Sequence, residues 1–120
     1  MYVQLSMEKH LTGTQTSYIV APVPLLITDL KLVSTVAAAS DTNNYEIIVS
    51  VGGTTIASRQ NNVAGGGFVA DAVETLTLSN QDKLLLDAGA VIKCVATKNG
   101  SAPDMSCRLD FACELARDFS

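Results

Sequence analysis

The chain has 120 residues, of which 48% are hydrophobic and only 17% charged, and its formal net charge is −4. This length fits one domain with a single core. The Lys and Arg residues are scattered, which argues against nucleic-acid binding, and no run of about 18 apolar residues is present to cross a membrane. Because soluble domains carry about 25% charged residues, we expect either an assembly subunit or a Ser/Thr-rich monomeric β domain.

Residues 1–16 contain few apolar side chains in no strict period. They lack the charged and apolar regions of a secretory signal peptide, so we expect synthesis and folding in a cytoplasm. The sequence predicts a short N-terminal arm over residues 1–16, which becomes ordered on a neighbouring molecule; a frayed terminus is the alternative. Pro22 and Pro24 follow, and they indicate an edge segment or a connector because proline cannot donate to a sheet ladder.

From Leu25 onward the apolar residues recur with a period of two, as in half-buried strands. In "LLITDLKLVSTV" the pattern places on one face Leu26, Leu30 and Leu32. In "NYEIIVSV" the alternating set is Tyr45, Ile47, Val49 and Val51. Gly52 and Gly53 then predict a two-residue hairpin leading to the short strand "TTIASR".

The stretch "NNVAGGGFVADAVETL" holds three consecutive glycines, residues 65–67, ahead of a segment with helical spacing. A phosphate loop needs a Gly-Lys-Ser/Thr ending, and a dinucleotide fingerprint needs G-x-G-x-x-G. Neither pattern is present. We therefore predict a mobile surface loop that binds no phosphate but permits close approach of a partner, followed by a short helical turn within residues 68–76.

The C-terminal half alternates again. In "DAGAVIKCVATK" the inward set is Ile92, Cys94 and Ala96, and in "MSCRLDFACEL" it is Cys107, Leu109, Phe111 and Cys113. Asn99 and Gly100 lie between the two strands and predict a hairpin. Seven or eight short strands with turn signals every eight to twelve residues predict an all-β, jelly-roll-like antiparallel β-sandwich over residues 17–120.

The three cysteines are an odd number in a chain without an export signal, and two of them share one inward face. We interpret them as free core thiols rather than zinc ligands, which usually come in closely spaced pairs. Cys107 and Cys113 are six residues apart on one extended strand, about 20 Å end to end, so they cannot pair with each other.

Catalytic groups are sparse. His10 is the only histidine and lies in the predicted arm, so no base is placed beside a nucleophile. The neighbouring acids Asp71 and Glu74 lack the aromatic surroundings of a glycosidase site, and the oxygen-rich turns at 41–44 and 80–82 do not match a calcium loop. The prediction is a non-enzymatic protein with no cofactor and no metal.

The strands "ITDLKLVSTV", "YEIIVSVGGTTIAS", "LLLDAGAVIKCVAT" and "CRLDFACEL" together resemble the head-decoration, or cement, proteins of tailed bacteriophages, over about residues 18–115. The resemblance rests on pattern and composition. The "DAG-A-V-I" turn is also similar to turns in tumour-necrosis-factor-like and C1q-like trimers and in fibre knobs.

The resemblance implies a homotrimer on the capsid surface that clamps neighbouring subunits of the major coat protein, without catalytic residues. It also implies that an N-terminal segment or a loop grips the coat. The corresponding candidate partner-binding residues are Tyr2, Val3, Leu5, Met7, Leu11, Gly65, Gly66, Gly67 and Phe68. Removal of residues 1–14 is expected to leave the fold intact. The alternative is a fibre or appendage knob that contacts a host-surface glycan or protein.

Overall fold

The computed structural model describes residues 2–35, 37, 42–62, 64–102 and 104–116. They form nine strands and one short 3-10 helix, η1 (Gln81–Lys83). The strands are β1 (Tyr2–Leu11), β2 (Gln15–Val20), β3 (Leu25–Ser34), β4 (Asn44–Val51), β5 (Thr54–Gln60), β6 (Val73–Thr75), β7 (Leu85–Leu86), β8 (Val91–Asn99) and β9 (Met105–Leu115). None of the described residues form a helix long and apolar enough to span a bilayer.

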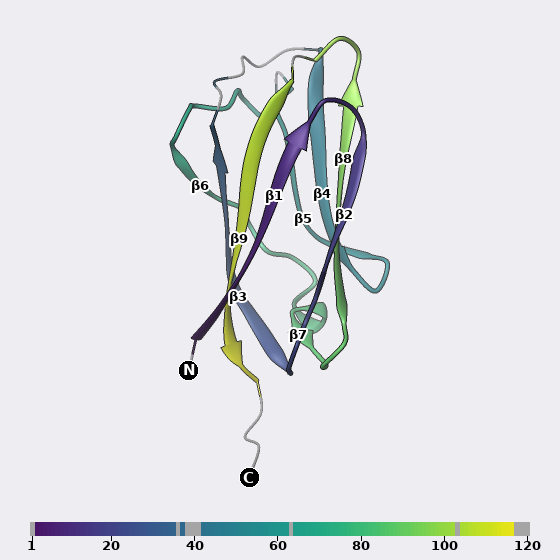
Figure 1. The fold of residues 1–120 in the computed structure, drawn as a ribbon, viewed down its shortest axis with the longest axis vertical. Coiled ribbons are helices and arrows are strands. Elements are labelled where there is room, and N and C mark those ends of the chain that lie inside the picture. Colours follow the sequence, from purple (N-terminus) through teal and green to yellow (C-terminus); the bar gives the residue numbers. More distant parts are fainter. Residues whose placement is uncertain (1, 36, 38–41, 63, 103, 117–120) are drawn as a thin grey trace.

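The strands form two antiparallel sheets that pack face to face (Figure 1). Sheet A has the order β1-β9-β3-β6, with β7 also pairing β3, and sheet B has the order β2-β8-β4-β5. The pairing is nested along the chain: β1 pairs β9, β2 pairs β8, β3 pairs β6 and β7, and β4 pairs β5. A long hairpin folded over itself gives this order, so the predicted jelly-roll sandwich is confirmed.

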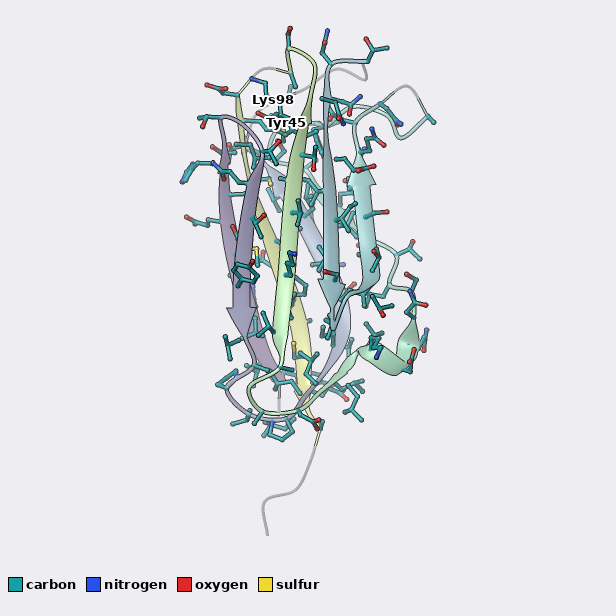
Figure 2. All side chains as sticks on the ribbon, turned by 90° about the vertical axis from the view of Figure 1, so that its right-hand side faces the viewer. Tyr45 and Lys98 are labelled. Carbon is teal, nitrogen blue, oxygen red and sulfur yellow. The ribbon has the colours of Figure 1, made fainter. Side chains whose placement is uncertain are left out.

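The space between the sheets is filled by alternate side chains of both. The predicted inward residues of β4, β8 and β9 are all buried, which confirms the period of two in these strands. All three cysteines are free and buried among them. Tyr45 lies near the upper end of the sandwich in Figure 2, and its hydroxyl donates a 3.1 Å hydrogen bond to the carbonyl oxygen of Leu11.

The predicted inward face of β3 is wrong in its first half. The register between β3 and β9 shifts between Ile27 and Asp29, which marks a β-bulge. A bulge inserts one residue and exchanges the two faces of the strand. Ile27 is therefore buried with Leu30, whereas Leu26 is only half-buried.

The two predicted hairpins have different outcomes. Gly52 and Gly53 have φ of 59° and 81° and join β4 to β5 within sheet B, as a tight hairpin turn requires. Gly100 also has a positive φ of 68°. The turn that it makes, however, joins β8 in sheet B to β9 in sheet A. Asn99 and Gly100 therefore form a connection between the sheets, and the hairpin prediction is wrong.

The predicted N-terminal arm is wrong as well. Residues 2–11 form β1, which pairs with β9 over ten positions at the edge of sheet A, and β2 begins at Gln15. Met7 and Leu11 belong to the core. The alternation of β1 is hidden in the sequence because Lys9 occupies an inward position and is itself only 1% exposed. Removal of this segment would leave β9 paired only with β3 and would take Met7 and Leu11 out of the core.

The short helical turn predicted within residues 68–76 is absent. Phe68 is buried, and Val73–Thr75 forms β6 beside β3. Asp71 has a φ of 60°, outside the right-handed helical region, and its N–H donates to the carbonyl oxygen of Ser34 at 2.7 Å. Pairing with sheet A therefore overrides the local helical spacing.

If β1 belongs to the cooperative fold, truncation of its inward side chain will destabilise the whole sandwich. Leu11→Ala should lower the free energy of unfolding by about 2–5 kcal/mol, as for other buried leucines. Glu8→Ala, an outward residue of the same strand, should change it by no more than about 0.5 kcal/mol. Urea unfolding monitored by circular dichroism measures both. Equally small effects would mean that β1 is only loosely attached.

Candidate interaction surface

The outer face of sheet B is nearly uncharged. Figure 2 views the sandwich with this sheet toward the reader. The outward positions of its three adjoining strands β2, β4 and β8 are Thr16, Tyr18, Val20, Glu46, Ile48, Ser50, Val91, Lys93, Val95 and Thr97. Of these ten residues only Glu46 and Lys93 carry a charge. We call this surface the sheet B outer face.

An apolar cluster occupies one end of the sheet B outer face. Tyr18 is 62% exposed, Val20 56% and Val91 41%. Val20 and Val91 are direct cross-strand neighbours, and Tyr18 lies opposite Lys93. The sequence-based prediction did not include this cluster, because it rested on the inward residues of each strand. The sequence does contain one indication of the cluster: Tyr18 and Val20 alternate with Ile19, so they lie on the same face of a strand.

The outer face of sheet A, in contrast to that of sheet B, carries several charged side chains. Lys31 pairs with Asp29 at 2.8 Å, and Arg108 pairs with Asp110 at 2.9 Å. The hydrogen bond from Lys31 lowers the pKa of Asp29. Burial acts to raise the pKa of Asp110, but hydrogen bonds from Ser6 and Arg108 outweigh it and leave that pKa below its ordinary value. The charges of this face are thus largely paired with one another.

Two adjoining hollows of about 300 and 330 Å³ lie on the outer face of sheet A. Both are lined by Val33 and Arg108. His10 and Ser106 line one of them, and their Nδ1 and Oγ atoms are 3.0 Å apart. The two residues are direct cross-strand neighbours of β1 and β9, so sheet register alone brings them together. The pair lies on an open sheet surface, where water competes for its hydrogen bonds.

No three His, Cys, Asp or Glu side chains gather to hold a metal ion within the described part of the chain. The acids considered in the sequence have other surroundings. Glu74 forms a 2.8 Å ion pair with Arg59, and Asp71 is exposed on the turn before β6.

Arg59 organises the glycine loop. Its Nη1 donates to the carbonyl oxygens of Gln60 at 2.8 Å and Gly66 at 2.9 Å, and its Nη2 donates to that of Gly67 at 2.9 Å. The guanidinium also lies 4.5 Å from the centre of the Phe68 ring, a cation–π contact. The loop is therefore attached to β5 rather than free, and a Cβ at Gly65 would collide with the carbonyl oxygen of Gln60.

The structure separates the predicted partner-binding residues into three groups: buried, half-buried and accessible. Met7, Leu11 and Phe68 are buried in the core, so their assignment to a partner surface is wrong: each packs within its own chain. Val3 and Leu5 are half-buried against the core. The accessible members are Tyr2, 77% exposed, and the glycine loop, residues 65–67.

A buried amine and two thiols share the interior between β1 and β8. Lys9 lies directly opposite Cys107, and its Nζ donates to Ser17 Oγ at 2.7 Å and to the carbonyl oxygen of Cys94 at 3.4 Å. Burial raises the pKa of the Cys107 thiol to about 11, with a further contribution from Cys94 and an opposing one from Lys9. Burial likewise raises the pKa of Cys94 and Cys113. Such thiols are unreactive in the folded state.

Replacement of Arg59 tests whether it holds the loop. Arg59→Met should lower the free energy of unfolding by about 1.5–3 kcal/mol, the range for hydrogen bonds to charged groups. Lys31→Met is the matched control, since its ion pair has the same 2.8 Å length but is exposed; its expected cost is about 0–1 kcal/mol. Urea unfolding compares the two variants. Equal losses would contradict this role of Arg59.

The buried Cys107 thiol predicts a pH dependence. The unfolded thiol has the ordinary pKa of 9.0, whereas the folded one has a pKa of about 11. Between these values only the unfolded state releases the proton, so this contribution to stability is complete below pH 9 and is lost as the pH rises toward 11. The slope approaches about 1.4 kcal/mol per pH unit. Urea titrations should give a shallower fall for Cys107→Ala than for the wild type; identical slopes would contradict the assignment.

Comparison with known proteins gives weak structural neighbours, among them two structures of one virus. No protein-family model and no characterised sequence matches the chain. A structure of infectious bursal disease virus, Gx strain, aligns with 97% of this chain at 17% identity and a TM-score of 0.37. The Gt strain of the same virus aligns with 98% at 16% identity and a TM-score of 0.36. This chain spans 30% of each viral chain, and likenesses at this level establish neither a shared fold nor a shared function.

Proposed function

We propose that the chain is a non-enzymatic structural protein of a virion: a decoration subunit that binds the surface of a phage head and bridges neighbouring coat subunits. Jelly rolls are an architecture of viral capsid and lectin domains. The space between the two sheets of this chain is filled by its own side chains, so the surface carries the function. The observation that carries the proposal is the sheet B outer face, with its near absence of charge.

The physics of this face suits docking to another protein. Burial of apolar surface is favourable by about 25 cal/mol per Å², and Tyr18, Val20 and Val91 supply such surface in one cluster. Only Glu46 and Lys93 would need to be desolvated as charges. An exposed tyrosine beside apolar side chains, such as Tyr18, is also a common anchor of protein interfaces.

The mechanism of a decoration subunit is that of a clamp. A subunit that binds only the assembled shell stabilises it by mass action. Contacts with two or more coat subunits raise the overall affinity without any new type of contact. The proposal includes synthesis in the host cytoplasm and a final location on the capsid surface. The homotrimer that the resemblance implies is not part of this proposal; it stays a prediction, and the two-fold pairing inferred below is an alternative to it.

A surface charge placed on the sheet B outer face should weaken attachment. Val91→Glu should reduce the affinity for undecorated heads of the encoding phage about tenfold, or ~1.4 kcal/mol, because a carboxylate would then be buried in an apolar contact. Val73→Glu is the matched control, since Val73 is 65% exposed on β6 in sheet A. Co-sedimentation of purified protein with heads measures both.

Saturable binding that is lost in Val91→Glu and retained in Val73→Glu supports the proposal. Absence of saturable binding by the wild-type protein would refute the decoration role. An equal loss in both variants would refute the assignment to sheet B. Far-UV circular dichroism confirms that each variant is folded before binding is compared.

The two hollows on sheet A favour a second candidate, a fibre or appendage knob that contacts a host-surface glycan. Their lining combines hydrogen-bonding groups with the apolar side chains of Val33, Val73 and Ala112, and paired charges suit a neutral, hydroxyl-rich ligand better than an ion. A glycan array separates the candidates. Binding that requires Arg108, without attachment to heads, would favour the knob.

A further inference from the structure

The two long sides of the sandwich, where the edges of the two sheets meet, differ in whether other parts of the chain cover them. On the side of β5 and β6, residues 76–80 close the gap between the sheets. The N–H of Leu76 donates to Leu30 in sheet A at 2.9 Å, and that of Ser79 donates to Ile56 in sheet B at 2.8 Å. The side chain of Asn80 adds a 2.6 Å hydrogen bond to the carbonyl oxygen of Thr55. This side is covered by the chain itself.

The opposite side, formed by β1 and β2, has no such cover. In Figure 2 these two strands, drawn in purple, lie next to each other on the left-hand side of the sandwich, and each is the outermost strand of its sheet. Among the described residues β1 pairs only with β9 and β2 only with β8. Val3 and Leu5 of β1 and Ile19 of β2 are inward-facing yet only half-buried. We call this surface the β1/β2 side.

The two edge strands differ in their protection against pairing. Natural edge strands are commonly blunted by charges, including charges that point inward. On β1 the ammonium of Lys9 lies buried between the sheets, and Glu8 is exposed beside it. The sequence of β2, QTSYIV, has no charged residue and no proline. It is rich in β-branched and aromatic residues, which favour strand pairing.

We propose that β2 pairs antiparallel with β2 of a second copy of this chain, which joins the two four-stranded sheets B into one continuous sheet. Directly opposite residues of an antiparallel pair lie on the same face. Pairing centred on Tyr18 satisfies this condition: Tyr18 faces Tyr18 of the partner subunit, Thr16 faces Val20 of the partner subunit, and Ser17 faces Ile19 of the partner subunit. Outward residues meet outward ones and inward residues meet inward ones.

This arrangement is two-fold symmetric and uses the same strand in both copies, so it closes at two subunits. The strand that pairs has six residues, so the new ladder extends over about 20 Å, and the ten-residue β1 lies beside it on the same side of the sandwich (Figure 1). The half-buried Val3, Leu5 and Ile19 would be covered, and most of the sheet B outer face would remain free.

The mass of the purified protein in solution is the first test. Light scattering across a concentration series should give two protomers at high concentration and a decrease on dilution. A monomer at every concentration, or a mass of three protomers, would overturn the proposal. This measurement needs no phage head, so its result is independent of the decoration role.

Two charge variants locate the contact. Tyr18→Glu places two like charges directly opposite each other at the two-fold axis, where they are destabilising, and should yield a folded monomer. Val91→Glu adds the same charge one strand inward from the edge and should leave the dimer intact. The reverse result would mean that the sheet B outer face, not the edge of β2, holds the second copy.

A cross-link measures the register. In Tyr18→Cys the two opposite Cβ atoms would be about 4.5–5.5 Å apart, and a backbone shift of up to about 1 Å would bring them within the 3.5–4.5 Å range of a disulfide. Diamide should then link the copies: the two thiols lose two protons and two electrons, and the azo bond of diamide is reduced to a hydrazine. The native cysteines are buried and stay unreactive. Val91→Cys is the control, and its cross-linking in place of Tyr18→Cys would refute the register.

Discussion

Pairing between the first and the last strand is the constraint on which the rest of the sandwich depends. β1 contributes its ladder to β9, its side chains to the core and the backbone acceptor for the buried hydroxyl of Tyr45. Because the strand pairs are nested, every other pair lies within the loop that this ladder closes. Contacts of such long sequence separation make folding slow compared with local pairing.

The two sides of the sandwich, and the outer faces of its two sheets, differ from each other. One side is closed by Arg59, Glu74 and the segment after β6, while the other leaves two strand edges without a ladder partner in the described structure. One sheet carries its charges in pairs on the outside, while the other exposes an apolar cluster around Tyr18. Under the proposed decoration role, the two faces and the β1/β2 side would contact separate neighbours.

The sequence predicted those elements whose alternation is uninterrupted. The inward faces of β4, β8 and β9 and the Gly52–Gly53 turn follow from local pattern, and each is confirmed. The failures have long-range causes. A bulge between Ile27 and Asp29 exchanges the faces of β3, and an inward Lys9 hides the strand period of β1.

The candidate site was predicted less well than the fold. Phe68 was assigned to a partner because its neighbours are glycines, whereas its actual neighbour is Arg59, which local sequence cannot indicate. Val3 and Leu5, by contrast, do lie on the β1/β2 side, where they are half-buried. The exposed position of Tyr18 could not be predicted from local sequence, because it depends on the pairing of β2 with β8.

The nested pairing also orders events during synthesis. The ribosome delivers β1 first and β9 only after 93 intervening residues, which at about 5–20 residues per second takes roughly 5–20 s. Throughout that interval β1 has no strand to pair with, and the apolar residues that it will bury face solvent. Whatever shields the nascent strand in those seconds therefore sets how much of the protein escapes aggregation, whatever the stability of the finished sandwich.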